Sequence, residues 1–117
     1  MDKKITIAVA MIAKNEGEHI ERALESAKDA DAIYVCDTGS TDGGTTVNIA
    51  KKYTDNVCTD YTWERSFCKA RNHVKSHVKE DWIFSLDCDE FIHDFSKVRE
   101  AVEHLVDRIR DTADAHL

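Results

Sequence analysis

The sequence has no proline and only four glycines among its 117 residues. Collagen-like and low-complexity proteins are therefore excluded, because these classes need a large share of one or both residues. No apolar run approaches the roughly 20 residues of a membrane-spanning helix, so we expect no membrane span. No small-residue cleavage site follows the apolar residues 5–12, so we expect no signal peptide and a cytoplasmic protein. Apolar residues still make up 42% of the chain, which is enough for a hydrophobic core.

The four cysteines share no C-x-x-C spacing and lie at Cys36, Cys58, Cys68 and Cys88. In a chain of this size they do not indicate a disulfide framework, and we expect buried thiols in a reducing compartment. A zinc site is an alternative, because Cys68, His73 and His77 fall within ten positions. Their spacing matches no standard zinc finger, however, and the favoured interpretation of the two histidines is that they are solvated.

Negative charge is concentrated in the last third of the chain. The formal net charge is −7, and it resides in residues 80–117, which hold eleven acidic and four basic residues. An acidic region repels the phosphate backbone of nucleic acids, so we expect no nucleic-acid partner. An anionic ligand bound near this region would need a cation between itself and the carboxylates.

Apolar and amphipathic segments alternate along the sequence. Short apolar segments typical of buried strands occupy residues 5–12, 32–36, 56–59 and 82–86. Apolar residues recur at helical spacing within residues 20–27, 47–53, 66–78 and 96–113. The order β-α-β-α-β-α-β-α predicts an α/β fold, with a mostly parallel sheet flanked by helices, in a single domain or part of one over residues 1–117.

Polar clusters follow three of the four predicted strands. The first strand leads to Lys14-Asn15-Glu16, the second to Asp37, and the fourth to Asp87-x-Asp89. Ligands of open α/β sheets bind beyond the carboxyl ends of the strands, so we expect these clusters to line one crevice. The loop at residues 38–44 lacks the Gly-Lys-Ser/Thr ending of a phosphate-binding P-loop.

The pair Asp87 and Asp89 is the strongest single indication of chemistry. Alternate residues of an extended segment point the same way. Two carboxylates on one side repel unless a cation lies between them or water solvates them, and oxygen ligands suit Mg²⁺ or Mn²⁺. A solvated acidic turn is the alternative, but the position directly after an apolar strand favours the metal.

Two further residues have a functional and a structural interpretation. Asp37 either accepts hydrogen bonds from a nucleoside or serves its own loop as a turn acid. Arg71 either clamps a diphosphate or forms a surface ion pair. Trp63 and Trp82 are expected in the core. The stripe of apolar residues in the last helix covers its own sheet, awaits a further part of the protein, or mediates self-association; it comprises Val98, Val102, Leu105, Val106 and Ile109.

Four segments in this order resemble family 2 glycosyltransferases with the GT-A fold: AMIAKNE at residues 10–16, VCDTGSTD at 35–42, FCKARN at 67–72 and LDCDE at 86–90. The resemblance covers about residues 5–95 and implies a nucleotide-diphospho-sugar donor, most commonly a UDP-sugar, with Mn²⁺ or Mg²⁺. It assigns the nucleoside to Ile12, Lys14, Asn15, Glu16 and Asp37. It places Arg71 near the donor. It makes Asp89 the principal metal ligand, with Asp87 beside it and nearer the ribose or the sugar.

The reaction that this resemblance implies is an inverting transfer. An acceptor hydroxyl attacks the anomeric carbon as the nucleoside diphosphate leaves, through a transition state of oxocarbenium character. A complete GT-A domain is considerably longer, so the chain resembles its donor-binding half, and no catalytic base is assigned. A homodimer or a partner chain is expected to supply the remainder. The alternatives are a nucleotide-sugar-binding module without turnover and a metal-dependent nucleotidyltransferase.

Overall fold

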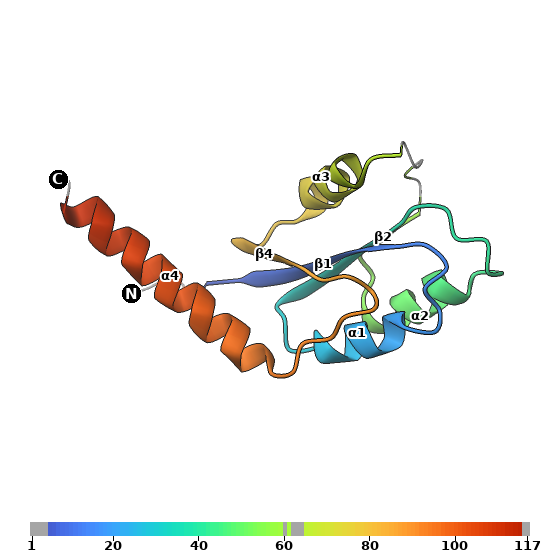
Figure 1. Cartoon of the computed structure of the whole chain (residues 1–117), viewed down its shortest axis with the longest axis horizontal. Helices are drawn as coiled ribbons and strands as arrows, with labels where there is room; N and C mark the ends of the chain where they lie inside the picture. The colour runs from blue at the N-terminus through green and yellow to red at the C-terminus, as the bar shows by residue number, and fades with distance from the viewer. Residues whose placement is uncertain (1–4, 60, 62–64, 116–117) are drawn as a thin grey trace.

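The computed structural model describes residues 5–59, 61 and 65–115, and its helices and strands alternate as predicted (Figure 1). The strands are β1 (Ile7–Ala13), β2 (Ala32–Asp37), β3 (Val57–Cys58) and β4 (Trp82–Ser85). The helices are α1 (Ile20–Ser26), α2 (Thr45–Tyr53), α3 (Phe67–His77) and α4 (Phe95–Ala115). Within the described residues no helix is both long and apolar enough to cross a membrane.

The described strands form one sheet in the order β3-β2-β1-β4, and every neighbouring pair is parallel. The register aligns Ala13 of β1 with Asp37 of β2, and Ala10 of β1 with Ser85 of β4. The first and fourth strands are therefore neighbours. The carboxyl ends of β1, β2 and β4 meet at one edge of the sheet, which confirms the expected α/β architecture.

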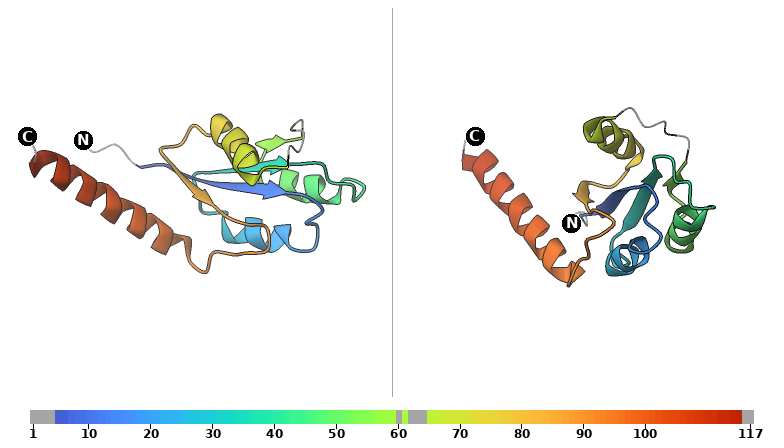
Figure 2. Two further views of the ribbon diagram at one scale, coloured as in Figure 1. Left: turned by 45° about the horizontal axis from the view of Figure 1, so that its top comes forward. Right: turned by 45° about the vertical axis from the view of Figure 1, so that its right-hand side comes forward.

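Helices cover both faces of the sheet. Figure 2 shows α3 on one face and the pair α1 and α2 on the other. Successive side chains of β1 point to opposite faces of the sheet. Ile7, Val9 and Met11 belong to the larger core cluster, whereas Ala8 and Ala10 belong to the smaller one. The central strand is thus buried on both faces, as its continuous apolar sequence predicted.

The first helix buries the face that its sequence pattern indicated. Ile20, Ala23, Leu24 and Ala27 are fully buried beneath the sheet. The third helix begins at the start of the predicted segment 66–78, where the side chain of Ser66 accepts a hydrogen bond from the Lys69 backbone N–H at 3.2 Å. Both helices follow from local sequence signals.

The last helix is divided between a packed half and a projecting half. Val98 and Val102 pack against the larger core cluster, whereas Leu105 and Ile109 are 45% and 53% exposed. The far end of α4 extends away from the sheet (Figure 1). The expectation that the apolar stripe covers its own sheet is therefore confirmed only for the first two turns.

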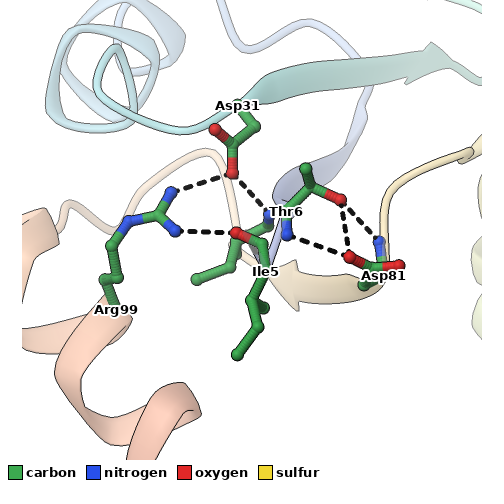
Figure 3. A network of polar contacts seen from close by, with 6 residues as sticks. Ile5, Thr6, Asp31, Asp81 and Arg99 are labelled. Atoms are coloured by element: carbon green, nitrogen blue, oxygen red, sulfur yellow. Dashed lines mark hydrogen bonds and ion pairs between the residues drawn. The ribbon is translucent and has the colours of Figure 1, made fainter. Parts of the chain in front are cut away.

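Polar contacts hold the packed half of α4 against the amino ends of the strands (Figure 3). Arg99 donates to the Ile5 carbonyl at 2.9 Å and pairs with Asp31 at 2.8 Å. The same Asp31 oxygen accepts the Ile7 backbone N–H at 2.7 Å. Thr6 and Asp81 exchange hydrogen bonds beside this pair. The network joins α4 to both β1 and the start of β4.

The cysteines and tryptophans were expected to be buried, and the structure confirms this only in part. No disulfide joins the four cysteines, all of which lie in the described part of the chain. Cys36 and Cys88 are buried as expected, but Cys58 is half-buried and Cys68 is exposed on α3, so the prediction of buried thiols was wrong for Cys68. Trp82 is half-buried against the core as predicted, and Trp63 lies outside the described residues.

Candidate functional site

A cavity of about 320 Å³ opens at the carboxyl ends of β1 and β4, beneath α3. Its walls come from three parts of the chain that are distant in the sequence. The lining comprises Ala10, Met11, Ile12, Glu16, Arg71, Val74, Lys75, Ser85, Leu86, Asp87, Cys88 and Asp89. The parallel register of β1 and β4 brings these segments together, as the rule for ligand sites in open α/β sheets requires.

The loop after β1 is locked to the loop after β2. Asn15 has a φ of +52°, a left-handed conformation that asparagine tolerates better than most residues. Its backbone N–H donates to the Ser40 hydroxyl at 2.8 Å, and its side-chain oxygen accepts the Thr41 N–H at 2.7 Å. The next residue, Glu16, donates its backbone N–H to the Thr46 hydroxyl at 3.0 Å. These contacts orient Glu16 at the mouth of the cavity.

The carboxylate of Asp37 is engaged by its own loop. It accepts the backbone N–H groups of Gly39 at 3.3 Å and Ser40 at 3.0 Å, together with the Ser40 hydroxyl. The side chain is buried and does not line the cavity. The structure thus shows the turn-acid arrangement, while a nucleoside contact of Asp37 stays a prediction.

The turn after β4 presents two acids around a buried cysteine. Cys88 is 4% exposed and donates its thiol to the Ile12 carbonyl at 3.3 Å. Asp87 and Asp89, on either side of it, are exposed and line the same cavity. Burial of Cys88 pins the centre of the turn to β1, so both carboxylates stay on the open side.

The electrostatics of this turn are negative. Burial, and to a smaller extent the charges of Glu16, Asp87 and Asp89, raise the pKa of the Cys88 thiol to about 12. Among the described residues, no lysine or arginine forms an ion pair with these three carboxylates. Three uncompensated oxygen donors around one cavity are a ligand set that fits Mg²⁺ or Mn²⁺.

The opposite wall is basic. Arg71 and Lys75 of α3 both line the cavity, and both side chains are exposed. Among the described residues no carboxylate pairs with Arg71, so its surface ion pair is not observed. The cavity therefore has acids on the β4 side and bases on the α3 side, which matches a diphosphate held between a cation and basic side chains.

Sequence reasoning missed two residues of this region. Lys75 lies four positions after Arg71, and this helical spacing could have placed the two on one face. Arg22 of α1 donates to the Asp89 carbonyl at 3.3 Å and lies 4.5 Å from the centre of the Phe91 ring. No local sequence signal predicts that contact, because Arg22 is 67 positions from Asp89.

The structure brings together five of the predicted site residues and separates three. Ile12, Glu16, Arg71, Asp87 and Asp89 line the cavity. Asn15 lines a neighbouring shallower hollow together with Glu16 and Asp89, while Lys14 is exposed at the end of β1 and Asp37 is turned into its loop. Their roles toward a ligand stay predictions.

Comparisons with known proteins now identify the class of protein. The family model described as glycosyl transferase family 2 matches residues 8–115, and the chain belongs to that family. It is 36% identical over 86 residues to the SPbeta prophage-derived glycosyltransferase SunS of Bacillus subtilis, with 72% of this chain covered. It is 33% identical over 104 residues to an uncharacterised glycosyltransferase of Rickettsia bellii, with 85% covered.

A solved structure agrees with the fold. The crystal structure of Staphylococcus aureus TarS 1-349 superposes with a TM-score of 0.67 over 88% of this chain, at 17% sequence identity. This likeness confirms the GT-A-like α/β fold. The chain spans 20% of the SunS protein, 32% of the Rickettsia bellii protein and 33% of the TarS chain.

Proposed function

We propose that this chain binds the nucleotide-diphospho-sugar donor of a metal-dependent, inverting glycosyltransferase, with the diphosphate in the cavity between β4 and α3. The observation that carries this proposal is the charge division of the cavity. Carboxylates of Asp87 and Asp89 face one side, and the cationic side chains of Arg71 and Lys75 the other. A bare anion would be repelled by the acids alone, so a cation between them and the diphosphate is required.

Each side of the cavity has a distinct task in this proposal. Asp89, supported by Asp87, holds a divalent cation, which when bound neutralises the charge that grows on the departing diphosphate. The guanidinium of Arg71 donates to phosphate oxygens, and Lys75 adds a second positive charge. Arg22 fixes the backbone of the turn through the Asp89 carbonyl, so the metal-binding carboxylate is held by contacts from two sides.

The test is donor binding with and without the cation. UDP and other nucleoside diphosphates are screened by the shift in melting temperature, with Mn²⁺, with Mg²⁺ and with a chelator. We expect a nucleoside diphosphate to raise the melting temperature only when the cation is present. Absence of any shift across the panel in Mn²⁺ would sink the proposal.

A substitution locates the effect. Asp89→Asn keeps the shape of the side chain and removes its charge. We expect the affinity for UDP in Mn²⁺, measured by calorimetry, to fall by roughly 10–100-fold, because a charge-assisted contact of about 1.5–3 kcal/mol is lost. Glu103→Gln on the exposed face of α4 is the matched control, since it removes one carboxylate far from the cavity. Equal affinity in Asp89→Asn and the control contradicts the assignment.

Turnover is a separate part of the proposal. Sugar transfer or donor hydrolysis in Mn²⁺, followed by release of the nucleoside diphosphate, is expected of the whole transferase. Binding without either reaction indicates the alternative, a nucleotide-sugar-binding module. Release of pyrophosphate from a nucleoside triphosphate would instead indicate a nucleotidyltransferase.

A further inference from the structure

A second cluster of chemically reactive side chains lies away from the donor cavity, where β2, β3 and α3 meet. Ligand atoms of Cys36, Cys58 and His73 all lie within 4.8 Å of one another. Cys36 is at the end of β2, Cys58 is in β3, and His73 is in the middle of α3. Three elements that are distant in the sequence therefore direct sulfur and nitrogen atoms toward one point.

A fourth side chain stands next to this cluster. The Nε2 atom of His77 lies 3.4 Å from Nε2 of His73, and the Sγ atom of Cys58 lies 3.2 Å from the same His73 nitrogen. His77 and the two cysteines also line one cavity of about 420 Å³. The expectation that both histidines are solvated was wrong for His73, which is half-buried and stacks near Tyr61 with 4.8 Å between ring centres.

The spacing of these atoms is that of a tetrahedral metal site. With Zn–S bonds of about 2.3 Å and Zn–N bonds of about 2.0–2.1 Å, tetrahedral geometry separates two nitrogens by about 3.3 Å and a sulfur from a nitrogen by about 3.5 Å. The observed separations of 3.4 Å between the two Nε2 atoms and 3.2 Å between the Cys58 Sγ and the His73 Nε2 fall within a few tenths of an ångström of these values. The ligand atoms of Cys36, Cys58 and His73 lie close enough together for one ion, and His77, which is outside that group of three, is the side chain that must move to complete the site.

Hydrogen bonding alone explains this arrangement poorly. The Nε2 atom of His73 is approached by both the Cys58 sulfur and the His77 nitrogen. A neutral imidazole nitrogen carries either one proton or one lone pair, so it can satisfy only one such neighbour well. A cation that accepts a lone pair from every member satisfies the whole group at once.

We propose that Cys36, Cys58, His73 and His77 form a zinc site. Two sulfur and two nitrogen donors in tetrahedral array are a typical zinc ligand set, whereas Mg²⁺ and Mn²⁺ prefer oxygen. On binding, each cysteine thiol loses its proton to solvent and the sulfur bonds to the ion. Two thiolates and two neutral imidazoles cancel the charge of Zn²⁺, so the site buries no net charge.

The site would brace the part of the fold with the least regular structure. The strand β3 has only two residues, and α3 is the one described helix on its face of the sheet (Figure 2). Zinc bound by Cys36, Cys58 and His73 ties both elements to β2. Because α3 also carries Arg71 and Lys75, the ion would hold the basic wall of the donor cavity in place. The zinc site itself does not depend on the proposed function.

The experiment uses Co²⁺ as a spectroscopic substitute for zinc in protein kept reduced with a phosphine. Thiolate coordination produces a charge-transfer band in the near ultraviolet, and tetrahedral geometry intensifies the visible bands. Carboxylates such as Asp87 and Asp89 produce no thiolate band, and the cysteine that lines the donor cavity is Cys88, so a band that persists in Cys88→Ser cannot come from that cavity. We expect both features in the unaltered chain and their loss on addition of Zn²⁺.

Variants locate the site. We expect Cys58→Ser to weaken the thiolate band strongly, because Cys36 is then the one thiolate left in the cluster, and to weaken zinc binding by more than the roughly 10–100-fold that loss of an outer-shell partner costs. His77→Ala is expected to keep the band but to lower the visible intensity. Cys68→Ser is the matched control, since Cys68 lies on the same helix but is exposed and outside the cluster.

Thermal stability supplies a second readout. Free zinc at about 100 times its Kd should raise the melting temperature of the unaltered chain by about 10 °C, and should leave that of Cys58→Ser unchanged. The proposal is overturned if the unaltered chain shows no thiolate band. It is equally overturned if the band keeps its full intensity in Cys58→Ser, if it disappears in Cys68→Ser, or if zinc stabilises Cys58→Ser as much as the unaltered chain.

Discussion

Cys88 shows how a single buried side chain organises the candidate site. Its thiol is anchored to the Ile12 carbonyl, and its neighbours Asp87 and Asp89 are left on the open side of the turn. The same three carboxylates that suit a cation raise the pKa of this thiol beyond the effect of burial. The burial of Cys88 therefore accounts both for the exposed position of Asp87 and Asp89 and for the raised pKa of the thiol between them.

The cysteines should differ in reactivity. With a pKa of about 12, the Cys88 thiol stays protonated at pH 7–9, and only a thiolate reacts readily. We expect iodoacetamide to modify the exposed Cys68 rapidly and Cys88 only after unfolding, as measured by mass spectrometry of peptides. Fast modification of Cys88 in the folded chain at pH 8 would contradict the buried position.

The same thiol predicts a pH dependence of stability. The folded state holds the Cys88 proton more tightly than the unfolded state. The contribution of the protonated thiol to the free energy of unfolding is therefore complete below pH 9 and is lost as the pH rises toward 12. Urea titrations measure the free energy of unfolding between pH 8 and pH 11. We expect this free energy to decline less with rising pH in Cys88→Ala than in the unaltered chain. An equal decline of the free energy of unfolding in the two proteins would show that the Cys88 thiol does not govern stability at alkaline pH.

At the scale of elements, α4 depends on a few polar contacts at its amino-terminal half. Arg99 joins the helix to the Ile5 carbonyl and to Asp31 (Figure 3). Both charged side chains are only about one-fifth exposed, at 23% and 20%. Such a pair is costly to break from one side, because the remaining charge stays partly desolvated.

Removal of this pair should destabilise the chain measurably. We expect Asp31→Ala to lower the free energy of unfolding by about 1.5–3 kcal/mol, since Arg99 and the Ile7 N–H both lose a charged acceptor. Urea unfolding followed by circular dichroism measures the change. Arg110→Ala on the exposed end of α4 is the control and should stay within about 0.5 kcal/mol. Equal effects of the two substitutions would contradict the proposed anchoring.

At the scale of the whole molecule, the projecting end of α4 makes the chain elongated. The radius of gyration is 15.8 Å, against about 13 Å for a compact domain of this length. The principal extents are 55 × 29 × 22 Å. Leu105 and Ile109 of α4 are exposed, so the packing of the described residues does not cover them.

This shape predicts a gradient of stability along α4. Backbone amides in the turn around Val98 should exchange hydrogen slowly, and those around Ile109 much faster, because few buried contacts protect the far end. The double substitution Leu105→Gln and Ile109→Gln should change the free energy of unfolding by less than about 0.5 kcal/mol. Uniform slow exchange along the helix, or a large loss of stability, would show that another surface covers this stripe.

Local patterns predicted most of the fold because they report burial directly. The continuous apolar sequence of β1 required two covered faces, and the spacing of Ile20, Ala23 and Leu24 defined the buried face of α1. The pattern left the partner of the α4 stripe open, and the structure covers only the part at Val98 and Val102. Periodicity shows which face is apolar but not whether a partner surface reaches it.

The candidate site was predictable where its residues follow strand ends, and less so elsewhere. Asp87 and Asp89 could be placed at the crevice because they directly follow a buried strand. Asp37 follows a strand in the same way, yet its carboxylate is engaged by Ser40 and Gly39. Residue type and position do not decide between a ligand and a neighbouring backbone N–H, because both satisfy the same acceptor.

The amino-acid sequence by itself determined the alternation of strands and helices, the buried faces of β1 and α1, and the acids that follow β4. These depend on neighbours along the chain. Only the tertiary structure decided that Lys75 and Asp87 line one cavity, that Arg22 donates to the Asp89 carbonyl, and that Cys36, Cys58 and His73 converge. These contacts depend on strand order and on the packing of α1 and α3 against the sheet, which bring distant residues within a few ångströms and leave no periodic signal in the sequence.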